Sequence, residues 1–183
     1  MSKQEIVNIL VELLDTYLND KNSSTLRELI PMVILGAKMN QEKLGYNGSI
    51  QNRKIEVKPQ NIDTSKKRKL NGGGSFNDYT LERFKSHEKD NPLILSAGYI
   101  NGKLIYILKF EFDCIKNKLK EQLERRFPKK RRETGQYLRS ASFSFKDYKD
   151  CKDLEVSFIR DDYSKYKEYI SRELFEFLQT KTV

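Results

Sequence analysis

The sequence predicts an α/β (α+β) domain in which helices flank a mixed central β-sheet. Three observations support this class. Apolar residues at helical spacing mark both ends of the chain, apolar or alternating runs between them indicate strands, and Asn101-Gly102 separates two strand-like runs as a hairpin turn does. With 183 residues the chain fits a single domain. We expect N-terminal helices over 1–40, a core sheet with its loops over 44–160, and a C-terminal helix over 162–179.

The first part of the chain is expected to form two helices and two strands. Apolar residues recur at helical spacing over 3–19, and a capping-box pattern at 25–28 begins a second helix that runs to about residue 40. A turn over 45–48 leads to a short strand ending near Ile50. A second strand covers 54–58, and Pro59 is expected to close it.

The rest of the chain alternates between predicted loops, strands and helices. Residues 63–78 are expected to form a long loop and residues 80–86 a short helix. The hairpin at Asn101-Gly102, a helix over 113–127 and a basic loop over 128–135 follow, and then two strands before the last helix. Tyr79, Tyr99 and Tyr106 lie in apolar runs and are predicted to be core residues.

The charge of the chain favours a polyanionic partner. The formal net charge is +9 and the isoelectric point is about 9.4. Because the positive residues are clustered, phosphate neutralisation is the best explanation of this excess. A basic protein without such a partner is the alternative.

Several classes of protein are poorly supported by the residue inventory. Cys114 and Cys151 lie far apart without metal-ligand spacing, which argues against zinc, and a chain of this length does not need a disulfide. The lone His87 stands in a polar run and is expected to be solvated. A phosphate-binding GxxxxGK[ST] loop, a signal peptide and a membrane-spanning run are missing from the sequence, so we expect an intracellular, cytoplasmic protein.

The segment Lys54-Ile55-Glu56-Val57-Lys58 carries the candidate chemistry. Because side chains alternate across a strand, Ile55 and Val57 face a core while Glu56 and Lys58 share the opposite face. A carboxylate can hold Mg²⁺, and an ammonium beside it can orient or deprotonate water and offset charge on a phosphoryl group. This pair suits phosphodiester hydrolysis if a further acid lies upstream. The alternative interpretation is the solvated face of an edge strand.

On these residues the sequence resembles the PD-(D/E)xK nuclease superfamily, the fold of many type II restriction endonucleases, over roughly residues 25–110. Glu56 and Lys58 occupy the E and K positions. The acid expected about ten residues earlier falls at Asn47, whose amide oxygen can ligate Mg²⁺ without charge; an aspartate replaced to inactivate the site would look the same. The resemblance implies a restriction-endonuclease-like fold and a Mg²⁺ site, with Mn²⁺ as a substitute, formed by Glu56, Asn47 and Val57. It also implies a catalytic acid from the preceding helix, Glu28 or Glu42.

Two segments are candidate DNA contacts. The first combines a cationic run with a glycine-rich stretch whose polar residues could read base edges, and the second is a basic stretch between 116 and 139. A flexible surface loop and a solvated helix face are the alternatives. The candidate residues are Lys66, Lys67, Arg68, Lys69, Asn71, Gly73, Ser75, Asn77, Lys129, Lys130, Arg131, Arg132 and Arg139.

These features together predict a Mg²⁺-dependent endonuclease that hydrolyses phosphodiester bonds in double-stranded DNA. We expect a sequence-specific, type II restriction-like enzyme of a bacterium or phage, acting as a homodimer because such DNA sites are two-fold symmetric. A junction or phage nuclease on the same fold is one alternative. A non-catalytic DNA- or RNA-binding protein with a decayed nuclease site is another, and an interaction protein with an incidental basic face is a third.

Overall fold

A six-stranded mixed sheet forms the centre of the protein, whose computed structural model describes residues 2–19, 24–40, 45–128 and 135–181. β3 and β5 are parallel, and the other neighbouring strands pair antiparallel. The predicted α/β class with a mixed central sheet flanked by helices is therefore confirmed. In order across the sheet the strands are β1 (Lys38–Met39), β2 (Gly48–Ile50), β3 (Arg53–Ile62), β5 (Leu93–Ile100), β6 (Lys103–Glu111) and β8 (Glu155–Ile159).

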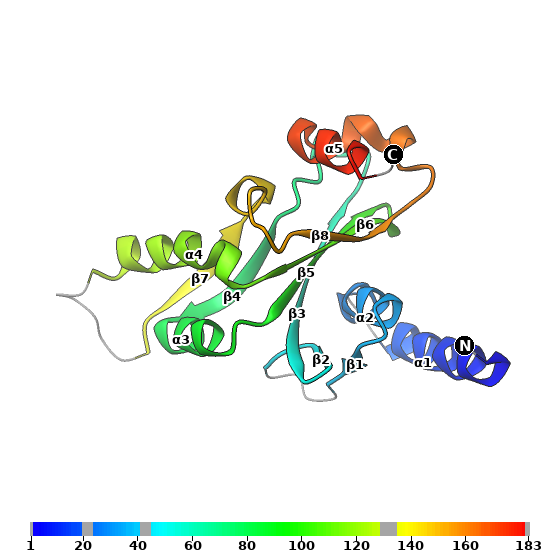
Figure 1. The fold of residues 1–183 in the computed structure, drawn as a ribbon, viewed down its shortest axis with the longest axis horizontal. Coiled ribbons are helices and arrows are strands. Elements are labelled where there is room, and N and C mark those ends of the chain that lie inside the picture. The colour runs from blue at the N-terminus through cyan, green and yellow to red at the C-terminus, as the bar shows by residue number, and fades with distance from the viewer. Residues whose placement is uncertain (1, 20–23, 41–44, 129–134, 182–183) are drawn as a thin grey trace.

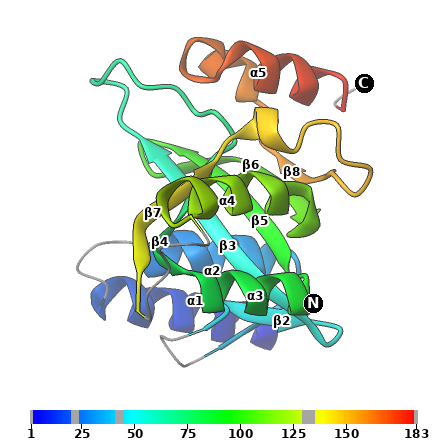
Figure 2. The same ribbon diagram turned by 90° about the vertical axis from the view of Figure 1, so that its left-hand side faces the viewer.

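Further elements cover both faces of this sheet (Figure 1). One face carries α2 (Ser24–Ile34), against which α1 (Lys3–Asn19) packs. The opposite face carries α3 (Leu81–Asp90), α4 (Asp113–Arg126) and a two-stranded sheet of β4 (Gly74–Thr80) and β7 (Tyr137–Phe143). The 3₁₀ helices η2 (Phe145–Asp147) and η3 (Tyr163–Tyr169) precede α5 (Arg172–Gln179), which packs at one end of the sheet (Figure 2).

Each face of the sheet has its own apolar core. Met32 of α2 packs with Ile55 and Val57 of β3 on one side, while aromatic residues of β4, β6 and β7 dominate the other. Tyr79, Tyr99 and Tyr106 are all buried, which confirms their prediction as core residues. The two cores show that β3 lies in the middle layer, with one row of its side chains on each side.

The connection between β3 and β5 positions the candidate site. Parallel strands cannot be joined by a tight turn, so the chain must cross over one face of the sheet. Here β4 and α3 form that crossover, and both lie against the face of β3 that carries Glu56 and Lys58.

β3 does not end at Pro59, so this expected boundary is wrong. Pro59 pairs with Ala97 in the parallel ladder with β5, and β3 continues to Ile62. The last β2 partner of β3 is Ile55, and beyond it the β2 side of β3 is open. The N–H of Val57 points to that open side. The backbone nitrogen of Pro59 points the same way, so its missing N–H costs no hydrogen bond between strands, and a strand tolerates proline at such a position.

Three other boundaries also differ from expectation. The second helix ends at Ile34 because Gly36 adopts a left-handed conformation (φ 67°) soon after it. Part of the expected loop over 63–78 is strand β4. The expected helix over 162–179 is divided into η3 and α5, because Ile170 between them forms a strand-like bridge with Leu70.

The remaining helices and turns agree with the sequence. The helices expected over 3–19 and 113–127 are present, and Asn101 and Gly102 have the positive φ angles that a two-residue hairpin turn requires. Within the described ranges, no helix combines the length and apolar character needed to cross a membrane.

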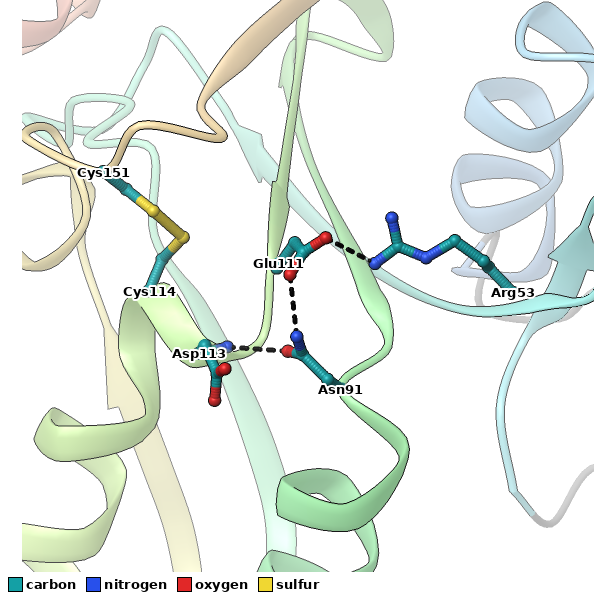
Figure 3. The surroundings of a disulfide bond; sticks show 6 residues. All are labelled: Arg53, Asn91, Glu111, Asp113, Cys114 and Cys151. Carbon is teal, nitrogen blue, oxygen red and sulfur yellow. Dashed lines mark hydrogen bonds and ion pairs between the residues drawn. A yellow bond between two sulfur atoms is a disulfide. The ribbon is translucent and has the colours of Figure 1, made fainter.

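Cys114 and Cys151 form a disulfide, although the length of the chain predicted no need for one (Figure 3). The two cysteines are 37 residues apart in the sequence, so their contact could not be predicted from local patterns; α4 and the turn after η2 meet only in the folded chain. A chain of polar contacts lies beside it. Asn91 accepts a hydrogen bond from the Asp113 N–H and donates one to Glu111, which also pairs with Arg53. These contacts join the ends of α3 and β6 to the starts of α4 and β3.

Candidate functional site

The polar face of β3 is the centre of the candidate site. Glu56, Lys58 and Gln60 are alternate residues of the strand and therefore share one face. Glu56 and Lys58 contact α3 and β4 there, while Ile55 and Val57 pack in the core on the other side, as predicted. Glu56 is only 3% exposed, so the alternative interpretation as a solvated face is wrong.

Two cations contact one oxygen of the Glu56 carboxylate. Lys58 Nζ lies 2.7 Å from Oε1 and Arg83 Nη2 lies 3.4 Å from the same atom. The other oxygen, Oε2, is buried and has no hydrogen-bond partner among the residues the structure describes. An unpartnered buried carboxylate oxygen is costly, and such groups are expected where an ion or ligand completes the site. Glu56 therefore offers one free oxygen beside an excess of positive charge.

The ammonium of Lys58 is held in place by β4. Its Nζ lies 4.1 Å from the centroid of the Phe76 ring, which is a favourable position for a cation. Gly74 packs on the stem of the same side chain, since a Cβ there would lie 2.6 Å from the Lys58 Cβ. This packing fixes the ammonium against Glu56 before any substrate is bound.

Arg83 also belongs to the site, although it is part of no motif that the sequence shows. Thr80 caps α3 by accepting the N–H of Arg83, and the guanidinium donates to the Asn77 carbonyl through Nη1 at 3.2 Å. Its position four residues before His87 places both on one face of α3. That spacing is visible in the sequence, but the packing of this face against β3 is not.

Asn47 and Glu28 meet at the open edge of β3, where β2 has ended. Asn47 Oδ1 accepts the N–H of Val57 at 2.8 Å, and Asn47 Nδ2 donates to Glu28 Oε2 at 2.7 Å. The carbonyl of Val57 faces the same edge, because both backbone groups of a strand residue point to one side. Three distant segments thus bring the predicted residues Glu28, Asn47, Val57 and Glu56 to one stretch of β3. The other candidate acid, Glu42, lies outside the described residues.

The oxygen atoms of this group are of the kind that binds a hard divalent cation. Mg²⁺ prefers carboxylate and carbonyl oxygens, which Glu56 Oε2, the Val57 carbonyl and Glu28 can supply. Asn47, however, presents its amide nitrogen to Glu28, in the place where two acids would share a cation. In the described parts of the chain, the one group of three acidic, histidine or cysteine residues with metal-ligand spacing is Cys114, Cys151 and Asp153, away from Glu56, and its sulfur atoms are already bonded to each other.

Tyr46, His87 and Asp90 form the side of the site next to α3. The Tyr46 hydroxyl donates to Asp90 Oδ2, which also pairs with Lys54 at 2.7 Å. Burial raises the pKa of the Tyr46 hydroxyl, and its hydrogen bond to Asp90 raises it further.

His87 is buried, contrary to the expectation of a solvated side chain, and its ring lies 2.9 Å from the Tyr79 hydroxyl. Burial and the charges of Arg83 and Lys58 lower the pKa of His87 to about 3, so this imidazole is neutral at pH 7.

The glycine-rich segment is fixed to the domain rather than flexible. Asn71, Ser75 and Asn77 are exposed, as DNA contacts require, but Gly73 is buried. A side chain on Gly73 would collide with the carbonyl of Phe143, and one on Gly72 would collide with Phe145 and Tyr148. Close packing inside the chain is thus enough to explain these glycines, without the approach of a ligand.

The predicted basic residues are divided between different places. Lys66, Lys67, Arg68 and Lys69 are exposed but follow the far end of β3, about 20 Å along the strand from Glu56 at ~3.3 Å per residue. Arg139 is exposed on β7, opposite β4. The remaining four, Lys129, Lys130, Arg131 and Arg132, lie outside the described residues.

Comparison with known proteins does not assign the chain to a family. No family model matches the sequence, and no curated protein matches it.

Proposed function

We propose that this chain is a Mg²⁺-dependent endonuclease that hydrolyses double-stranded DNA. The observation that carries the proposal is the Glu56 carboxylate, which is buried, paired to Lys58 through one oxygen and unpartnered at the other. Such a costly group calls for a functional explanation, and a bound cation that completes the carboxylate is one that the neighbouring oxygen ligands support. The net charge of +9 supports a phosphate-bearing substrate.

Each residue of the site has a role in this proposal. Glu56 holds the metal through Oε2, with the Val57 carbonyl and Glu28 beside it. When bound, Mg²⁺ would lower the pKa of the attacking water and polarise the phosphate. Lys58 orients that water or offsets charge on the phosphoryl group, and Arg83, whose side chain is 37% exposed, binds a phosphate oxygen.

The finer parts of the proposal rest on the resemblance to PD-(D/E)xK nucleases. In support, Glu56 and Lys58 lie on a central strand of a mixed sheet, preceded by the helix with Glu28 and the turn with Asn47. We extend this to a sequence-specific, type II restriction-like enzyme that acts as a homodimer inside the cell. Mn²⁺ is expected to substitute for Mg²⁺.

Plasmid cleavage tests the proposal directly. The unmodified chain should nick or linearise supercoiled plasmid with Mg²⁺ or Mn²⁺ but not with EDTA. Glu56→Gln and Lys58→Met should each slow cleavage by at least ~100-fold while DNA binding persists. The exposed residues Glu88 and Lys89 provide matched controls, and Glu88→Gln and Lys89→Met should cut normally. If the unmodified chain leaves plasmid intact at every metal concentration, the proposal fails.

A second candidate, a non-catalytic DNA-binding protein, is favoured by one observation. The hydrogen bond from Asn47 to Glu28 satisfies both side chains without a metal. Asn47→Asp separates the two functions, because a carboxylate at position 47 would restore a two-acid site that holds Mg²⁺ mainly by charge. If cleavage is absent in the Asn form and appears only in the Asp form, the chain as it stands is a binding protein.

A further inference from the structure

A polar groove lies next to the Glu56 site, between the start of β4 and the α4–η2 side of the molecule. It has a volume of about 610 Å³, and the residues that matter most for its chemistry are Gln60, Asn71, Ser75, Lys118, Ser142 and Lys146. Gln60 follows Lys58 in the same row of β3. The groove therefore begins immediately beyond the candidate catalytic residues.

The charges in this groove suit an anion. Lys118 and Lys146 approach acids only at 3.9 Å, and their side chains are 42% and 73% exposed. Such long surface pairs contribute little, so both ammonium groups remain available. The one acid of the lining, Asp147, accepts hydrogen bonds from the N–H and hydroxyl of Ser144.

The walls of the groove are held rigidly. Asn71 donates its N–H to Gln60 Oε1 at 3.0 Å, and its own side-chain oxygen accepts the Gly73 N–H. On the other wall, the Gln122 amide bonds both backbone groups of Ser142, at 3.0 Å and 2.7 Å. A ligand would meet these walls already ordered, which reduces the entropy lost on binding.

Polar groups of β4 and Arg83 of α3 lie between the groove and Glu56. Ser75 lines the groove, and Asn77 lies two residues farther along the exposed face of β4. The Asn77 carbonyl accepts a hydrogen bond from Arg83, and the same guanidinium reaches Glu56. An extended anion that crosses β4 would therefore meet Lys118 or Lys146 at one end and Arg83 at the other.

We propose that this groove binds the sugar–phosphate backbone of the DNA strand next to the bond that is cut. The substrate named here rests on the proposed function. The donors are lysine, serine and side-chain amide groups, which contact phosphates of any sequence, so the groove contributes affinity and register rather than base recognition. Ser75, expected from the sequence to contact base edges, contacts backbone in this arrangement.

Salt-dependent binding in EDTA tests the groove without requiring cleavage. The probe is a fluorescein-labelled duplex of random sequence, measured by anisotropy over a series of salt concentrations. The Lys118→Ala/Lys146→Ala double variant should lower the log–log salt slope by roughly 1.8, or ~0.9 for each phosphate that is no longer neutralised. Lys103→Ala/Lys165→Ala removes two exposed lysines elsewhere and should leave the slope unchanged. Ser142→Asp, which adds a negative charge to the groove, should also weaken binding.

The outcomes separate this proposal from the proposed function. If the Lys118/Lys146 variant has an unchanged salt slope and the same melting temperature as the unmodified chain, the groove does not bind DNA, even if the chain cuts DNA. A reduced slope with an unchanged control supports the groove, even if no variant cuts DNA under any metal condition; in that case the nuclease function alone fails. If the control variant lowers the slope equally, binding depends on net charge alone, and the proposed role of the groove is again contradicted.

Discussion

The Glu56 site and the basic loop at Lys66–Lys69 lie at opposite ends of one strand, and they are built in opposite ways. The loop consists of four consecutive cations that are all exposed. The site combines Glu56, Lys58 and Arg83 from a strand and a helix, with the carboxylate buried and its partners within 3.4 Å. Exposed charges cost little to keep in a folded chain, whereas a buried charge is tolerated only with partners.

This difference shows which charges constrain the fold. The basic run is obvious in the sequence, yet its four side chains are exposed. The Glu56 cluster is inconspicuous in the sequence, but β4 and α3 must be placed correctly for it to form. The two regions should therefore respond very differently to substitution.

The largest expected effect is the loss of stability in Glu56→Ala. Removing this carboxylate leaves the Lys58 ammonium, whose side chain is only 13% exposed, without its acidic partner, so we expect a loss of about 3 kcal/mol in the free energy of unfolding. Lys67→Ala should change it by less than ~0.5 kcal/mol. Urea unfolding measures both. Glu111→Ala breaks a more exposed ion pair with Arg53, so its loss in the free energy of unfolding should lie between those of the other two variants. If the Glu56 variant is as stable as the Lys67 variant, the ion pair of Glu56 does not stabilise the fold.

A smaller effect is expected for Asn47→Asp. This change replaces the hydrogen bond to Glu28 by two facing carboxylates, which should cost about 1.5–3 kcal/mol in EDTA. Mg²⁺ should restore much of that loss by binding between the acids. Melting temperatures of both forms, with and without Mg²⁺, measure this loss and its recovery. Equal melting temperatures for the Asn and Asp forms, at every Mg²⁺ concentration, would place position 47 outside any metal site.

The buried His87 predicts a pH dependence of stability. Its pKa is about 3 in the folded chain, against an ordinary value near 6.5, so between these values only the unfolded chain binds the proton. Stability is therefore complete above about pH 6.5 and falls as the pH is lowered, by up to ~1.4 kcal/mol per unit. Unfolding at pH 6.5 and 5.0 should show this slope, and His87→Gln should flatten it. A slope unaffected by His87→Gln would mean that other groups cause the dependence.

The smallest effect on the fold is expected in the basic loop. Replacing Lys66, Lys67, Arg68 and Lys69 by alanine should leave the melting temperature nearly unchanged, because all four are exposed. If these residues contact phosphates, the salt slope of DNA binding falls by roughly 0.9 for each contact. An unaltered slope would show that the loop points away from DNA and that the sequence prediction for it is wrong.

Local patterns predicted much of this fold. Helical spacing identified α1 and α4, the Asn-Gly pair identified the β5–β6 hairpin, and strand alternation placed Glu56 and Lys58 on one face of β3. These features depend on neighbours in sequence, so a pattern of a few residues contains the information.

Features that depend on distant contacts could not be predicted in the same way. The strand at β4 exists because β7, more than fifty residues later, pairs with it. Pro59 is tolerated because β2 stops short of it, and Arg83 reaches Glu56 because the crossover places α3 over β3. The polar neighbours of His87 in the sequence predicted a solvated side chain, although four aromatic rings from outside its helix contact it.

The disulfide has a consequence for the proposed groove. Cys114 and Cys151 close a covalent ring that contains α4, the basic residues 129–132, β7 and η2. The wall with Lys118, Ser142 and Lys146 thus belongs to a cyclic segment, whereas Glu56, Lys58 and Arg83 lie outside it. By loop entropy alone, a ring of this size stabilises the fold by about 4 kcal/mol. In a reducing compartment the ring would open, and the wall that we propose to face DNA would loosen while the carboxylate site kept its own contacts.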